Sequence, residues 1–62
     1  MKEVAIVRNA DNEEMYFAES IGQCKEWCKL NNITGSNGEY IALGTYNEET
    51  RYFDLEDYME IA

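Results

Sequence analysis

The chain has 62 residues, of which 45% are hydrophobic, and its aromatic residues are five Tyr, two Phe and one Trp. This length allows a single domain that buries only about 60% of its unfolded surface, while the aromatic content excludes a disordered chain. Thirteen acidic residues against five basic ones give a net charge of −8. That charge disfavours nucleic acid and anionic membranes as direct partners and favours a basic protein surface.

The first half of the chain predicts a β-hairpin followed by a helix. Residues 2–8 and residues 14–18 are rich in β-branched or large apolar side chains, so both segments are predicted to be strands. Ser20 followed by Gln23 is the capping-box pattern that begins a helix, and the helix is expected to end at Asn31. Its apolar stripe comprises Ile21, Cys24, Trp27 and Cys28.

The second half predicts another hairpin. Residues 39–46 alternate between two faces, residues 50–53 form the fourth strand, and Asp54 can cap a last helical turn or two. That short C-terminal helix would carry Leu55, Tyr58, Met59 and Ile61. The predicted fold class is therefore α+β: residues 1–62 form a single acidic domain with a small four-stranded antiparallel sheet (ββαββ with a short C-terminal helix) packed against one helix.

Alternation along the predicted strands assigns the aromatic residues to two faces of the sheet. The face under the helix is expected to carry Phe17, Ile41, Leu43 and Phe53. The opposite face is expected to carry Tyr16, Tyr40, Tyr46 and Tyr52. A tyrosine-rich face of this kind favours protein binding, because tyrosine contributes a large contact area with little loss of entropy.

The residues that usually carry catalysis or bind metals are scarce. The chain has no His, and its carboxylate pairs lie at predicted turn tips in water, so we predict that it is not an enzyme. Cys24 and Cys28 are too few for a four-ligand zinc site and are expected to be core thiols. We predict no cofactor and no metal.

Carboxylates and tyrosines are therefore the best candidates for a site. If both hairpin tips lie at one end of the sheet, their negative charge would face a basic cleft and compete with phosphates for its Arg and Lys groups. We expect a non-catalytic binder that blocks a basic nucleic-acid-binding host protein, as a phage or mobile-element inhibitor of the anti-restriction or anti-CRISPR type would. Its predicted partner-binding residues are Asp11, Glu13, Glu14, Tyr46, Glu48, Glu49, Tyr52, Asp54, Glu56 and Asp57.

Two other functions are consistent with the sequence. A small homodimer or assembly subunit would bury the tyrosine face against a second copy. A redox-responsive regulator would use Cys24 and Cys28, provided that both thiols react in the folded state. The apolar run at the N-terminus is too short for a signal peptide or a membrane span, and a cytoplasmic location in a bacterial host is expected.

Overall fold

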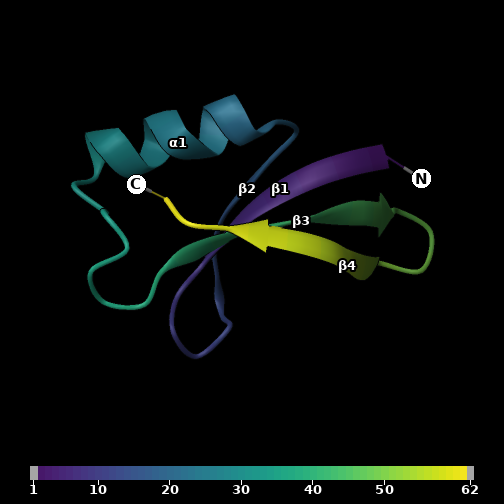
Figure 1. The fold of residues 1–62 in the computed structure, drawn as a ribbon. Coiled ribbons are helices and arrows are strands. Elements are labelled where there is room, and N and C mark those ends of the chain that lie inside the picture. The colour runs from purple at the N-terminus through teal and green to yellow at the C-terminus, as the bar shows by residue number, and fades with distance from the viewer. Residues whose placement is uncertain (1, 62) are drawn as a thin grey trace.

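Four strands and one helix make up the fold of the chain. A computed structural model describes residues 2–61. The elements follow the order ββαββ, as predicted: β1 (Lys2–Arg8), β2 (Glu14–Ala18), α1 (Ile21–Leu30), β3 (Tyr40–Asn47) and β4 (Tyr52–Met59). Figure 1 shows α1 lying across one face of the sheet.

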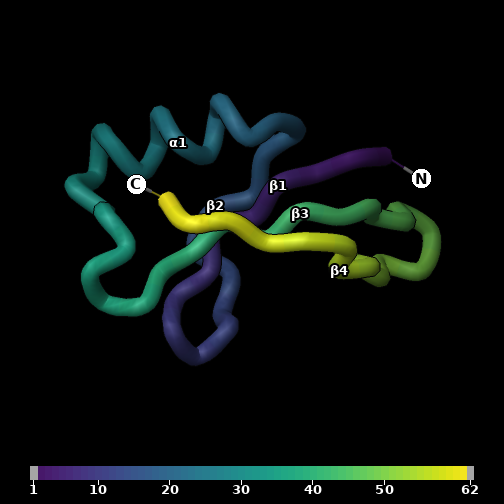
Figure 2. Tube along the Cα trace, in the orientation of Figure 1, coloured from purple at the N-terminus to yellow at the C-terminus, as the bar shows by residue number. Residues whose placement is uncertain are grey.

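The four strands form one antiparallel sheet in the order β2-β1-β3-β4. β1 and β3 are central, and β2 and β4 are the two edges. The helix connects β2 to β3 and packs on β2, β1 and β3. Within residues 2–61 its backbone does not lie close to that of β4, although Met59 of β4 packs against the core beneath the helix. The backbone trace shows the same arrangement, with β4 on the outer side of β3 (Figure 2). One edge strand is therefore left uncovered.

The helix begins where the capping pattern predicts. The Ser20 hydroxyl accepts a hydrogen bond from the backbone N–H of Gln23 at 3.3 Å. The Gln23 side chain reaches back one residue further than a standard capping box, because its Oε1 accepts from the backbone N–H of Glu19 at 3.1 Å. At the other end, the backbone N–H of Asn31 donates to the carbonyl of Trp27, and Asn32 takes a positive φ of 57°.

The main core lies between α1 and the sheet. Cys24 and Cys28 are fully buried against a cluster contributed by the strands, namely Ala5, Val7, Ala18 and Ile41. The rings of Tyr16 and Trp27 stack at 4.9 Å with an interplanar angle of 6°. Tyr16 was predicted to lie on the opposite face, and this prediction is wrong, because Tyr16 pairs with Val7 and shares its helix-facing side.

The opposite face carries a second, thinner apolar layer. Val4, Ile6 and Ala42 are buried although no helix covers them. The rings of Phe17 and Tyr46 meet edge to face at 5.4 Å on this side. Phe17 and Phe53 were predicted to lie under the helix, and this is wrong because they pair with Ile6 and Tyr46, which point away from it. Tyr40 and Tyr46 lie on this face as predicted.

The predicted C-terminal helix is also absent, since β4 continues to Met59. The register pairs Leu55 with Gly44 but Asp57 with Leu43, so Glu56 is an extra residue that forms a β-bulge. Leu55 and Tyr58 are successive residues of β4 on the face of the sheet away from α1. The bulge increases the distance between them along the chain from the usual two residues to three. A spacing of three is typical of helices, and it explains why this segment resembled one.

Candidate protein-binding surface

The segment that includes the β3–β4 turn and β4 is strongly acidic. Between Asn47 and Ile61 the chain has six acidic residues and one basic residue, Arg51, a net charge of 1 − 6 = −5. Asn47 shapes the turn by accepting hydrogen bonds from the backbone N–H groups of Glu49 at 3.0 Å and Thr50 at 3.3 Å. The hairpin carries the predicted residues Glu48 and Glu49 in its turn and Asp54, Glu56 and Asp57 along β4. Glu60, which was not among the predicted residues, follows β4.

One of these carboxylates already has a partner. Glu48 forms an ion pair with Lys2, with 2.8 Å between Oε1 and Nζ. This contact raises the pKa of Lys2 and lowers that of Glu48. Both side chains are exposed, so the ion pair is screened by solvent and contributes little to stability. The other carboxylates of the hairpin are free of ion pairs within residues 2–61.

The second predicted cluster lies at the other end of the sheet. β1 and β3 are antiparallel, with Arg8 opposite Tyr40 and Lys2 opposite Tyr46, so the β1–β2 turn and the β3–β4 turn are at opposite ends. The expectation that both tips share one end is therefore wrong. The structure separates Asp11, Glu13 and Glu14 from Glu48 and Glu49 in the β3–β4 turn. Figure 1 shows these two turns apart.

The β1–β2 turn is held by its own hydrogen bonds. The Asn9 side-chain oxygen accepts from the backbone N–H groups of Asp11 and Glu13, both at 2.9 Å. Its amide nitrogen donates to the Glu13 carboxylate at 2.9 Å. One of the three carboxylates in this cluster thus has a structural role within the turn.

The two predicted tyrosine anchors are neighbours that point to different sides. Tyr46 pairs with Phe53, and Tyr52 pairs with the next residue, Asn47, so successive side chains alternate between the faces. Tyr46 lines a hollow of ≈ 320 Å³ together with Lys2, Asn47, Glu48 and Glu49. Tyr52 is 65% exposed on the side away from Tyr46, so the prediction that it shares a face with Tyr40 and Tyr46 is wrong. Three predicted residues, Tyr46, Glu48 and Glu49, therefore share one hollow.

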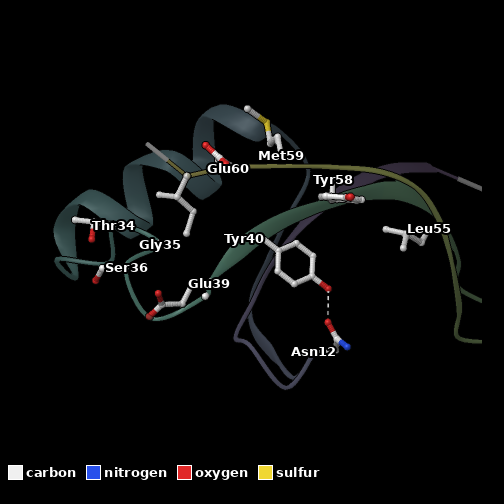
Figure 3. A pocket seen from close by; sticks show the side chains of 12 residues that line it. Asn12, Thr34, Gly35, Ser36, Glu39, Tyr40, Leu55, Tyr58, Met59 and Glu60 are labelled. Carbon is white, nitrogen blue, oxygen red and sulfur yellow. Dashed lines mark hydrogen bonds between the residues drawn. The ribbon is translucent and has the colours of Figure 1, made fainter.

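Residues outside the predicted set form a larger cavity. It has a volume of ≈ 750 Å³ and lies between the loop that precedes β3 and the C-terminal half of β4 (Figure 3). Tyr40, Leu55 and Tyr58 form one wall, and Tyr58 is 70% exposed. Simple alternation along β4 from Leu55 would assign Tyr58 to the face of the sheet that α1 covers. Its true position, on the opposite face, could be predicted only with knowledge of the bulge at Glu56.

The two cysteines are poorly placed for chemistry. Both are buried and unpaired, and the Cys24 thiol donates to the carbonyl oxygen of Ala5 at 3.3 Å. Burial raises the pKa of Cys24 to about 11 and also raises that of Cys28. Because the thiolate is the reactive form, this environment makes both thiols less reactive than an exposed cysteine.

No group of three potential metal-ligating side chains occurs within the described range 2–61. In the same range no helix has the length and apolar character needed to cross a bilayer. No protein family, curated protein or solved structure matches the chain.

Proposed function

We propose that the chain is a non-catalytic protein-binding domain whose β3–β4 hairpin recognises a basic protein surface. The observation that carries this proposal is the net charge of −5 between Asn47 and Ile61, on an edge of the sheet that α1 leaves uncovered. Carboxylates on a rigid hairpin lose less conformational freedom on binding than carboxylates on a mobile segment.

The hairpin offers contact area beside its charge. Tyr46 contributes to the hollow next to Glu48 and Glu49, and Tyr52 is exposed at the start of β4. Tyrosine side chains flanked by charge are typical of interface centres, whereas carboxylates at the rim mainly speed encounter and select the partner. This composition supports binding to a protein, because the phosphates of a nucleic acid would be repelled.

Such a domain acts as an inhibitor when the basic surface is one that otherwise holds nucleic acid. The same Arg and Lys groups that bind phosphates can bind carboxylates, often in bidentate geometry. A host nuclease of a restriction or CRISPR system has a surface of this kind. The more specific form of the proposed function is that the domain inhibits such a nuclease by covering this surface.

Two matched double variants test the role of the hairpin. Glu49→Gln with Glu56→Gln and Asp11→Asn with Glu14→Gln both change the net charge by +2, but the first pair lies on the β3–β4 hairpin and the second on the β1–β2 hairpin, whose outer strands are the opposite edges of the sheet. Inhibition of DNA cleavage is measured for a panel of purified restriction and CRISPR nucleases at about 50 and 200 mM salt.

We expect the wild type to inhibit at least one nuclease, more strongly at low salt. The hairpin variant should inhibit about tenfold less, and the β1–β2 turn variant about twofold less at most. Equal effects of the two variants, or no inhibition of any nuclease, would contradict the proposed function.

A further inference from the structure

Two aromatic rings form part of one wall of the ≈ 750 Å³ cavity. The rings of Tyr40 and Tyr58 lie 6.1 Å apart at an angle of 77°. Figure 3 shows both rings beside Leu55, with the loop that carries Gly35 and Glu39 facing them. Tyr40 is at the beginning of β3 and Tyr58 near the end of β4, so the sheet itself positions the pair.

Hydrogen bonds fix one of these rings. The Tyr40 hydroxyl donates to the Asn12 side-chain oxygen at 2.7 Å and accepts from Arg8 at 3.4 Å. Asn12 is itself held in the turn by the hydrogen bond from its backbone N–H to the Asn9 carbonyl at 3.0 Å. A ring held in this way loses little freedom when a ligand packs on it, so the site is largely preorganised.

The remaining wall of the cavity is apolar and acidic. Met59 and Ile61 contribute apolar surface, Glu39 and Glu60 contribute carboxylates, and no Lys or Arg lines the cavity. Aromatic faces and carboxylates both attract cations, and apolar surface can cover the methylene groups of a long cationic side chain.

The chain already binds one guanidinium on the same face. The guanidinium carbon of Arg8 lies 5.2 Å from the centroid of the Phe53 ring, and an Arg8 nitrogen donates to Tyr40. Arginine suits this setting because its planar group stacks on rings while donating hydrogen bonds at its edge. Tyr58, with 70% of its surface exposed, has no such partner among residues 2–61.

We propose that this cavity binds an arginine side chain of the basic partner, carried by an extended segment that lies along the outer edge of β4. The proposal rests on the proposed function, since it names the anchor by which the partner is held. Among residues 2–61 β4 pairs only with β3, so the other side of its backbone is available to a further strand.

The charge of β4 determines which segment can pair there. Asp54, Glu56, Asp57 and Glu60 lie on or just after β4, and no basic residue follows Arg51. Two copies joined through β4 would bring eight of these carboxylates together, which disfavours a second copy of the chain. A segment bearing arginine would instead compensate them.

The test uses an extended peptide of eight residues, the length of β4, with one central arginine between alternating Thr and Val. Two control peptides have the same sequence with citrulline or lysine in place of the central arginine. Citrulline keeps the shape of arginine without the charge. Binding is followed by amide chemical shifts in NMR titrations of the whole chain. We expect shifts at Gly35, Leu55 and Tyr58, and affinity at least about fivefold higher for arginine than for citrulline, with lysine between them.

Matched variants locate the site. Tyr58→Ala should weaken arginine-peptide binding about fivefold, whereas Tyr52→Ala, also on β4 and similarly exposed, should leave it unchanged. Glu60→Gln should weaken binding more than Glu56→Gln, because only Glu60 lines the cavity. These surface variants should keep the fluorescence of Trp27 unchanged, which confirms folding.

Equal binding of the arginine and citrulline peptides, or equal effects of Tyr58→Ala and Tyr52→Ala, would overturn the arginine site. A lysine peptide that binds as tightly as the arginine peptide would also overturn it. Nuclease inhibition that still depends on Glu49 and Glu56 would then leave the proposed function intact. Sedimentation showing a dimer that Tyr58→Ala dissociates would assign the cavity to a second copy and likewise overturn the proposal.

Discussion

Replacing Gly44 by alanine should separate β3 from β4. Gly44 is buried and faces away from α1, directly under the Phe53 ring. A Cβ atom at this position would collide with the backbone carbonyl oxygen of Asp54 and would lie 3.0 Å from Cε1 of Phe53. The carbonyl belongs to the strand backbone, which cannot move without disturbing the register of the hairpin. The local close approach of the strands therefore requires glycine.

The expected cost is large relative to the stability of so small a domain. Overpacking a buried site costs about 1–3 kcal/mol, and a backbone obstacle places Gly44→Ala near the upper end, at about 3 kcal/mol. A domain of this length has a free energy of unfolding of roughly 3–9 kcal/mol. With a urea dependence of about 1 kcal/mol/M, the unfolding midpoint should fall by about 3 M.

Urea unfolding followed by the fluorescence of Trp27, the only tryptophan, measures this change. Gly22→Ala is the matched control, because the nearest atom to its added Cβ, Oγ of Ser20, is 3.9 Å away and the residue lies in α1. Alanine there should stabilise the domain by about 0.5 kcal/mol, since it is the better helix former. A Gly44→Ala variant as stable as the wild type would refute the close approach of Asp54 to β3.

Three further changes test other parts of the fold. The raised pKa of Cys24 means that the folded state favours the neutral thiol, so this stabilisation is complete below pH 9 and is lost as pH rises toward 11. The difference in unfolding free energy between wild type and Cys24→Ala should therefore shrink by about 2 kcal/mol over that range in chemical denaturation; a constant difference would contradict the burial of the thiol. Ser20→Ala removes the N-cap of α1 and should cost about 1 kcal/mol in thermal unfolding, whereas Ser20→Gly should cost only a few tenths. Deletion of Glu56 straightens the bulge but keeps Leu55 opposite Gly44, so stability should change by less than about 1 kcal/mol, and a larger loss would show that the bulge itself is required.

The elements with local signals could be predicted from the sequence. The α1 helix is defined by the Ser20–Gln23 cap and by the spacing of Cys24 and Cys28, both of which act within one turn. The order ββαββ followed from turn residues and alternation. The assignment of side chains to the two faces of the sheet was harder to predict, because aromatic residues occupy both faces. Register decides that Tyr16 lies under the helix and Phe17 lies opposite, and register depends on partners distant in sequence.

The residues of the candidate surface could likewise be predicted only where they are close together in the sequence. The acidity of the β3–β4 hairpin is a property of contiguous sequence, so its carboxylates could be named in advance. The separation of Glu48 and Glu49 from Asp11 and Glu14 depends on how β1 pairs with β3, which local patterns do not encode. The cavity beside Tyr58 was missed because a one-residue bulge shifts the outward position and because Tyr40 meets Tyr58 only through pairing of β3 with β4.

The position of α1 also makes the charge of the domain uneven, which affects the side from which a basic partner approaches. α1 carries Lys25, Glu26 and Lys29, a net charge of 2 − 1 = +1, whereas the segment from Asn47 to Ile61 carries −5. Among the described residues α1 lies closest to β2, β1 and β3, so its cations are carried on another part of the domain than the acidic edge strand. A basic partner is therefore attracted more strongly to the segment from Asn47 to Ile61 than to α1, so long-range electrostatic forces favour an approach to the uncovered edge of β4.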